Sequence, residues 1–80
     1  MTSEQILDRV QNIFRDIFDD DSLVITREIA AKDIEDWDSL THINLIVAIE
    51  KEFKTKFSLS EMQTFKNVGD VIDLISSKIS

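Results

Sequence analysis

Eighty residues, 42% of them hydrophobic, are enough for one domain with a single core but too few for a deep enclosed cavity. The formal net charge of -7, from 9 basic and 16 acidic residues, opposes binding to nucleic acid or to an anionic membrane surface and favours partner proteins with basic patches. No cysteine is present, which excludes disulfides and thiolate sites, so any thiol that the protein uses must come from a cofactor.

The sequence lacks the signals of membrane insertion and export. No stretch approaches the roughly 18 apolar residues of a membrane-spanning helix, and the N-terminus has no basic region followed by an apolar run. Proline is absent, glycine occurs once, at Gly69, and the β-branched residues recur at helical rather than alternating spacing. We therefore expect a cytoplasmic, monomeric, all-α protein in which residues 1–80 form a single domain.

The first predicted helix spans about residues 3–18, where apolar residues recur at steps of four, three and four. These residues are Ile6, Val10, Ile13 and Ile17. Thr2 and Gln5 match a capping box at its start. The acidic run over residues 19–21 is unfavourable at the negative end of a helix, so we expect the helix to end there. The run lacks the glycine and the ligand spacing of an EF-hand, so we expect a solvated corner and no metal site.

A long connection follows over residues 19–38, and such a length indicates either a functional loop or one that apolar anchors pin to the core. The candidate anchors are Leu23, Val24, Ile25, Ile29, Ile34 and Trp37. A second strong helix is predicted over about residues 39–54. It closes near Lys51, Lys54 and Lys56, whose positive charges suit a helix C-terminus.

Two shorter signals complete the chain. Ser58 followed by Glu61 is another capping-box pattern, and it predicts a short helical turn over residues 61–65. A last helix is predicted over about residues 68–79, with Asn67 as its N-cap. The expected fold therefore has three main helices and one short helix, with a long loop between the first two.

The second predicted helix carries two apolar stripes that lie about 150° apart around its axis. The first stripe consists of Leu45, Ile46, Ile49 and Phe53. The second stripe consists of Leu40, Ile43 and Val47. Because so small a domain cannot bury a helix all round, we expect the second stripe to be exposed as an interaction surface. The alternative is that the loop over residues 19–38 folds over it.

Ser39 opens the second helix and has two interpretations. The simpler one is an N-cap, whose hydroxyl accepts a backbone N–H bond. The other is a hydroxyl open to the active site of another enzyme, where a phosphodiester built on it would lie near the positive end of the helix dipole. His42 suggests a base for a nucleophilic Ser39, but the chain has no G-x-S-x-G elbow and no glycine before residue 69. We therefore expect no catalysis by the chain itself.

The residues around Ser39 resemble a known family. The segment Asp38-Ser39-Leu40 and the helix that follows it are similar to the D-S-L motif and following helix of acyl carrier and peptidyl carrier proteins. Residues 67–71, Asn-Val-Gly-Asp-Val, resemble the T-V-G-D segment that opens the last helix of that family. The resemblance spans nearly the whole chain, and it implies an acyl-carrier-like bundle of three or four helices.

The resemblance implies a carrier that is not itself an enzyme. A phosphopantetheinyl transferase, using coenzyme A and magnesium, would attach 4′-phosphopantetheine to the Ser39 hydroxyl. The thiol of the arm would carry acyl or aminoacyl groups as thioesters, which agrees with the absence of cysteine from the chain. The carrier would deliver these groups to enzymes of fatty acid, polyketide or related specialised biosynthesis.

The resemblance also implies a partner-binding surface near Ser39. Asp38 would assist the transferase, and Glu50 matches an acidic recognition position. The apolar part of the docking face would consist of Leu40, Ile43 and Val47. The partners implied are the transferase and the acyl- or aminoacyl-loading and acyl-processing enzymes, with basic and apolar docking patches.

Two departures from the family pattern affect these expectations. The glycine that precedes D-S-L in the family is missing from residues 33–37, and Thr41 and Asn44 stand where fatty-acid carriers are often acidic. Docking is therefore expected to depend more on apolar contact, which slightly favours a specialised pathway. The alternative function is an acidic helical adaptor, whose second stripe receives a partner helix and whose Ser39 only caps.

Overall fold

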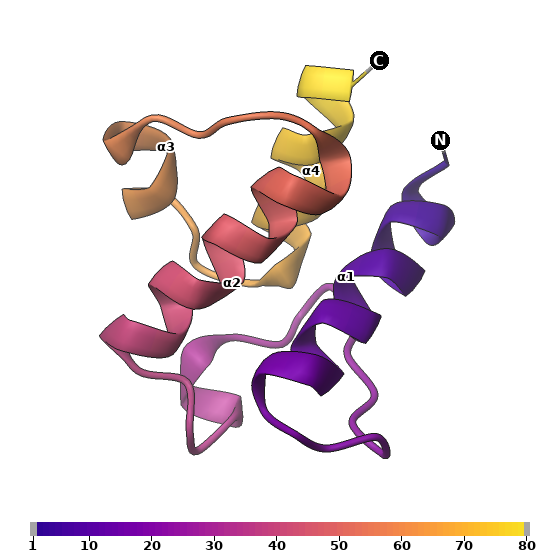
Figure 1. Ribbon diagram of the computed structural model, residues 1–80, viewed down its shortest axis with the longest axis vertical. Helices are drawn as coiled ribbons and strands as arrows, with labels where there is room; N and C mark the ends of the chain where they lie inside the picture. The colour runs from indigo at the N-terminus through magenta and orange to yellow at the C-terminus, as the bar shows by residue number, and fades with distance from the viewer. Residues whose placement is uncertain (1, 80) are drawn as a thin grey trace.

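The structure, a computed structural model, describes residues 2–79 and contains α-helices and one short 3₁₀ helix within that range (Figure 1). The elements are α1 (Ser3–Ile17), η1 (Ala31–Asp33), α2 (Ser39–Phe53), α3 (Leu59–Gln63) and α4 (Val68–Ile79). The all-α fold and the predicted order of three main helices and one short helix are confirmed. None of the helices in this part of the chain is long and apolar enough to cross a bilayer.

The starts of α1, α3 and α4 follow the predicted caps. The Thr2 hydroxyl accepts from the Gln5 N–H at 3.2 Å, and this capping box begins α1. Asn67 Oδ1 accepts from the Asp70 N–H at 3.0 Å at the start of α4. Ser58 caps α3 as expected, but α3 covers Leu59–Gln63, so the predicted turn over residues 61–65 was placed too late. The reason is that helical residues begin directly after the N-cap, not at the acidic partner three positions on.

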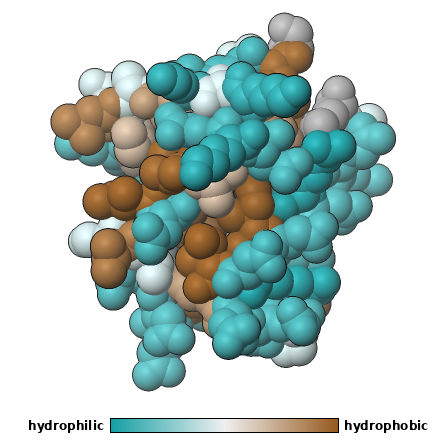
Figure 2. All heavy atoms as spheres, in the orientation of Figure 1, coloured by the Kyte–Doolittle hydropathy of each residue, from teal (hydrophilic) through white to brown (hydrophobic). Residues whose placement is uncertain are grey.

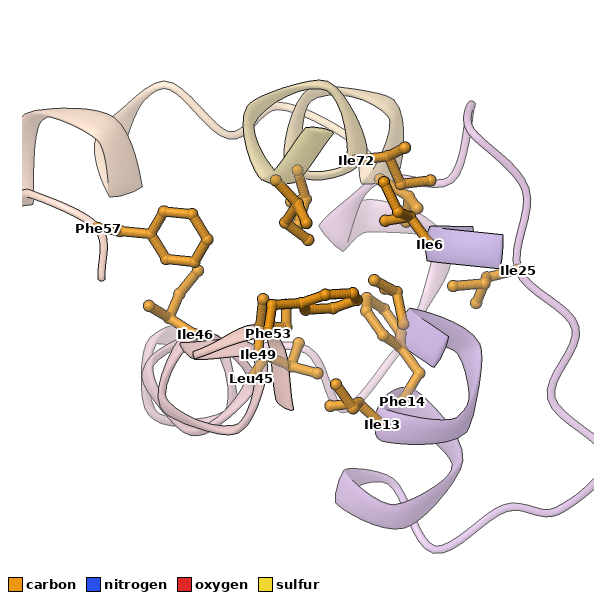
Figure 3. Packing of buried hydrophobic residues seen from close by; sticks show 14 residues of the cluster. Ile6, Ile13, Phe14, Ile25, Leu45, Ile46, Ile49, Phe53, Phe57 and Ile72 are labelled. Atoms are coloured by element: carbon orange, nitrogen blue, oxygen red, sulfur yellow. The ribbon is translucent and has the colours of Figure 1, made fainter. Parts of the chain in front are cut away.

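The helices α1, α2 and α4 enclose one apolar core, with α1 in contact with both others (Figure 3). The buried hydrophobic residues are Ile6, Val10, Ile13, Phe14, Ile25, Leu45, Ile46, Ile49, Phe53, Phe57, Val68, Val71, Ile72 and Ile75. They include all of the first stripe of α2, as predicted. The opposite side of α2 therefore does not take part in the core.

The long connection between α1 and α2 is fastened to both α1 and α4. On the α1 side, Ile25 is buried and its N–H donates to Gln11 Oε1 at 3.0 Å. On the α4 side, the Arg27 guanidinium contacts both carboxylate oxygens of Asp73 at 2.9 and 3.0 Å. The Arg27 carbonyl also accepts from the Gly69 N–H at 2.8 Å. A Cβ at Gly69 would lie 3.2 Å from that carbonyl oxygen, so glycine permits this close approach.

The anchors predicted within this connection are confirmed with one exception. Those that pack against the core are Leu23, Ile25, Ile29, Ile34 and Trp37. Trp37 sets its ring edge-on against Phe14, with the ring centroids 5.2 Å apart. Val24 is 66% exposed, so its assignment as an anchor was wrong. Its two neighbours in sequence take the positions that face the core.

The acidic corner after α1 ends the helix as expected. Asp19 adopts the left-handed conformation, with φ 51°, directly after the C-cap Phe18. The Asp20 carboxylate accepts from both the hydroxyl and the N–H of Ser22, at 2.6 and 3.0 Å. These bonds, the hydroxyl first, lower the pKa of Asp20 from its ordinary value of 3.8. The corner is thus held by local hydrogen bonds of its own.

Candidate functional site

The start of α2 is capped by Asp38, not by Ser39. The Asp38 carboxylate accepts from the Thr41 N–H at 2.9 Å, and the Thr41 hydroxyl accepts from the Asp38 N–H at 2.7 Å. This reciprocal pair satisfies two of the backbone donors that a helix start leaves open. Ser39 is the first helical residue, so the interpretation of Ser39 as an N-cap was wrong. An aspartate is favoured as the cap because its negative charge meets the positive end of the dipole.

The Ser39 side chain is left open to solvent. The residue is exposed, and its hydroxyl makes no hydrogen bond with any part of the chain from residue 2 to residue 79. Its position in the first turn places it beside the unpaired N–H groups and the positive pole of α2. An oxygen in this setting is available to react with another enzyme's substrate.

The Asp38 carboxylate supplies a fixed negative charge next to Ser39. The backbone N–H of Thr41, followed by the Thr41 hydroxyl, lowers the pKa of Asp38 from its ordinary value of 3.8. Hydrogen bonds that favour the charged form of a carboxyl have this effect. Asp38 is therefore ionised at neutral pH, and the site combines an open hydroxyl with a neighbouring anion.

An open groove of about 650 Å³ begins at Ser39 and runs between α2 and α3. Its lining consists of Ala31, Trp37, Asp38, Ser39, His42, Ile43, Leu59, Met62 and Gln63. Most of these side chains are apolar, and they come from η1, the loop before α2, α2 itself and α3. Figure 2 shows hydrophobic side chains gathered over this side of the molecule, around α3 and α2.

His42 faces Trp37 instead of Ser39. The Trp37 Nε1–H donates to His42 Nδ1 at 3.2 Å, and the two rings are stacked with their centroids 6.0 Å apart. The His42 ring also meets the Phe65 ring edge-on at 6.1 Å. The structure therefore does not join Ser39 and His42 as a nucleophile with its base. His42 forms part of the groove wall near Ser39, as a surface residue with a structural contact.

The second stripe of α2 is exposed. Leu40 is 68% exposed, Ile43 55% and Val47 42%. The alternative that the loop over residues 19–38 covers these residues was wrong, because that loop is bound to α1 and α4 instead. An apolar surface of three large side chains therefore starts one residue after Ser39, where a partner protein can contact it.

Glu50, the acidic residue predicted on the docking face, is partly used inside the molecule. Its side chain is half-buried, and Glu50 Oε2 accepts from the Phe57 N–H at 2.8 Å. This bond ties the turn after α2 back onto the helix. Glu50 lies in a separate hollow with Val47, away from the groove that begins at Ser39.

The structure also identifies residues that the sequence analysis did not assign to the site. Thr41 fixes the start of α2, and Leu59 and Met62 bring α3 to the groove. Asp38 and Thr41 have the three-residue separation of a capping box, but not the Ser/Thr and Glu/Gln residue types of its sequence signal. No sequence signal places α3 beside Ser39, because that contact depends on the tertiary fold.

Comparison with known proteins gives the family. Residues 8–75 match the family model described as "Phosphopantetheine attachment site". The chain is 31% identical over 80 residues to the acyl carrier protein of Thermosynechococcus vestitus, covering 100% of this chain and 99% of that protein. It is 32% identical over 79 residues to the acyl carrier protein of Coprothermobacter proteolyticus, covering 99% of this chain and 96% of that protein.

Solved structures agree with this assignment. The fold is similar to a holo acyl carrier protein from Geobacter metallireducens, with a TM-score of 0.87 and 55% identity, over 92% of this chain and 85% of that one. It is also similar to a putative acyl carrier protein from Mycobacterium tuberculosis, with a TM-score of 0.71 and 31% identity, over 94% of this chain and 95% of that one. The chain therefore belongs to the phosphopantetheine-attachment family and is an acyl carrier protein, a carrier whose prosthetic group is 4′-phosphopantetheine.

Proposed function

We propose that Ser39 Oγ is the atom to which 4′-phosphopantetheine is attached. The observation that supports this most strongly is the open state of the Ser39 hydroxyl, since Asp38 and Thr41 perform the capping at the start of α2. The lone pairs of the Ser39 oxygen face solvent at a helix end, where a transferase can reach them. The negative phosphodiester formed there is stabilised by the positive pole of α2.

In attachment, the chain's part is to present one oxygen. In the active site of a phosphopantetheinyl transferase, Ser39 Oγ bonds to the phosphorus of the pantetheine phosphate of coenzyme A and gives up its proton. The pyrophosphate P–O bond of coenzyme A breaks, and adenosine bisphosphate is the leaving group. Asp38 provides that enzyme with a negative charge beside the reacting oxygen, suited to a magnesium ion or a basic side chain. Once bound, the arm supplies a terminal thiol that holds an acyl or aminoacyl group as a thioester.

The groove beside Ser39 fits an elongated, flexible arm fixed at that residue. Its walls are mainly apolar, with Ile43 from α2 and Leu59 and Met62 from α3 along its length. Apolar walls of this kind exclude water from a chain that lies between them. His42 and Gln63 add polar groups to the lining, for the polar groups of the arm.

The exposed second stripe is the apolar part of the surface on which partner enzymes dock. Leu40, Ile43 and Val47 lie on one face of α2. Asp38, and the oxygen of Glu50 that Phe57 does not hold, give that face its negative groups. The partners are the transferase and the loading and processing enzymes of fatty acid, polyketide or related synthesis, and residues 1–80 serve as one carrier domain.

The test is the intact mass of the protein after incubation with coenzyme A, magnesium and a broad-range phosphopantetheinyl transferase. We expect the wild type to gain one phosphopantetheine group and Ser39→Ala to gain none, with unchanged circular dichroism. Ser3→Ala is the matched control, because Ser3 is also an exposed first residue of a helix with a capping box before it. Attachment to Ser39→Ala, or its loss in Ser3→Ala alone, would refute the site.

A further inference from the structure

The exposed face of α2 does not end at Val47. Lys51 lies four residues beyond Val47 and Lys54 three residues beyond Lys51, so the second stripe continues along the same side of the helix. Both lysines are exposed, and Lys56 follows in the next turn. Together with Val47, Glu50 and Thr55, these three lysines line an open hollow of about 370 Å³. We call Lys51, Lys54 and Lys56 the basic end.

The basic end is not neutralised from within the described part of the molecule. The ion pairs among residues 2–79 are Arg9–Glu52, Arg27–Asp73 and Lys78–Glu61, and none of them includes these lysines. A third of the 9 basic residues of the chain therefore stand within six positions, against a net charge of -7 for the whole. The basic end is therefore a positively charged surface on a protein whose net charge is negative.

The two glutamates on either side of Lys51 in the sequence each have a contact elsewhere in the molecule. Glu50 Oε2 accepts from the Phe57 N–H at 2.8 Å, and Glu52 pairs with Arg9 of α1 at 2.9 Å. The helix dipole favours a cation in the last turn, which accounts for Lys51. Lys54, in the left-handed C-cap position with φ 53°, lies at the same negative end of the helix, whereas Lys56 lies beyond it. The dipole therefore accounts for Lys51 and Lys54 but not for Lys56.

We propose that the basic end receives an acidic patch of a partner enzyme, so that the docking face has opposite charges at its two ends. The proposal rests on the proposed function, because it assigns the surface around Ser39 to docking. Asp38 marks the negative end, the second stripe forms the apolar middle, and the lysines form the positive end. A partner with the complementary order, basic then apolar then acidic, fits this face in one direction only.

The distance between the two ends makes this direction specific. The face runs from residue 38 to residue 54, which corresponds to about 24 Å at the rise of an α-helix. That exceeds the screening length of about 8 Å at physiological ionic strength, so each end attracts its own counterpart independently. A partner docked in reverse meets like charges at both ends, and its active site is carried away from Ser39.

An acidic protein patch fits the basic end better than an extended polyanion does. Nucleic acid and anionic membranes spread negative charge over a wide surface, and this chain, at -7 overall, repels them. A patch of a few carboxylates meets only the three lysines and the hollow between them. Charge complementarity therefore selects a protein partner.

The test uses a synthetic amphipathic helical peptide with a leucine face, three glutamates at one end, three lysines at the other and a nitroxide spin label beside the glutamates. Added to ¹⁵N-labelled holo protein, it should broaden the amide signals of residues 51–56 and spare those near residue 38. A peptide with its charged ends exchanged and the label in the same place, now beside the lysines, should instead broaden the signals near residue 38 and spare residues 51–56. Equal broadening at both ends of α2 would overturn the proposal.

Charge variants provide the controls. Reversal of the basic end, with Lys51→Glu, Lys54→Glu and Lys56→Glu together, should weaken peptide binding by about tenfold, since three exposed attractions are lost. The glutamine versions of the same three lysines give a second variant set if reversal destabilises α2. Lys32→Glu with Lys66→Glu, two other exposed lysines, should leave binding unchanged. If the Lys32/Lys66 variant loses as much binding as the variant of the basic end, the proposal is overturned.

Two further measurements distinguish a protein partner from a membrane, and the basic end from the attachment site. Tighter binding of the basic end to phosphatidylserine vesicles than to the peptide would overturn the assignment to a protein partner. The phosphopantetheinyl transfer assay on Ser39→Ala reports independently on the attachment site. Modification of that variant refutes Ser39 as the attachment site. If the variant stays unmodified but the labelled peptide broadens both ends of α2 equally, only the proposal for the basic end is refuted.

Discussion

The two apolar stripes of α2 are alike in chemistry and opposite in use. Ile49, in the first stripe, is 1% exposed, and Ile43, in the second, is 55% exposed. The first stripe packs into the core with α1, whereas the second lies open beside Ser39. Residue type therefore does not decide the role of an isoleucine on this helix. Its position around the helix axis does, because only one side of α2 can face the core.

The largest difference between the two stripes is expected in the free energy of unfolding when one isoleucine of each stripe is truncated. Ile49→Ala should lower the free energy of unfolding by about 2–5 kcal/mol, because it leaves a cavity in the core. A domain of this size has a total stability on the order of 5 kcal/mol, so the variant should be largely destabilised in urea titrations. Ile43→Ala, the matched control, should cost far less. Equal losses would show that the second stripe is covered in solution.

A smaller effect is expected where the core meets the groove. Trp37 contacts Phe14 of the core by its ring edge and donates its Nε1–H to His42 of the groove. Trp37→Phe keeps an aromatic ring and removes the donor, so we expect a loss of about 1 kcal/mol in unfolding free energy. A double-mutant cycle with His42→Leu measures the coupling between the two residues. A coupling near zero would contradict the hydrogen bond.

The pH dependence of stability should report the cap that both stripes share. The pKa of Asp38 is lowered in the folded state, so its contribution is present above the ordinary value of 3.8 and is lost as the pH falls through the lowered value. Asp38→Asn retains a capping side chain but removes this titration. The melting temperatures of wild type and variant should differ at pH 7 and converge in acid. A constant difference would contradict the lowered pKa.

The smallest effect should come from the charge of the whole molecule. A net charge of -7 produces self-repulsion in the folded state, and salt reduces it. Raising sodium chloride from about 10 mM to about 150 mM shortens the screening length from about 30 to about 8 Å. We expect the melting temperature to rise by a few degrees, as read by circular dichroism. An unchanged melting temperature would show that self-repulsion is not significant.

The sequence predicts those parts of the fold whose signals are local. The periodic apolar stripes, the capping boxes at Thr2 and Ser58 and the N-cap at Asn67 are each contained within a few residues, and each is confirmed. The course of the long connection is not local, because the Arg27–Asp73 pair joins positions 46 residues apart. No sequence pattern within either segment reports that contact.

The candidate site was predictable in part. Asp38 and Ser39 are adjacent, and both are residue types that cap helices, so the residue type alone leaves the choice open. Thr41 decides it, because its hydroxyl accepts a hydrogen bond from the Asp38 N–H. Similarly, Glu50 has the spacing of a surface carboxylate, and its bond to the Phe57 N–H depends on how the chain turns after α2.

The reciprocal clamp of Asp38 and Thr41 has a consequence for the working cycle of the carrier. Esterification of a helix-capping hydroxyl would weaken its hold on the first turn each time the group was installed or removed. Here the cap is one residue upstream and unaffected by what happens to Ser39. The protein without the arm, with the arm, and with an acyl group on the arm can therefore have nearly equal stability. An enzyme that binds one of these forms meets the same helix in all three.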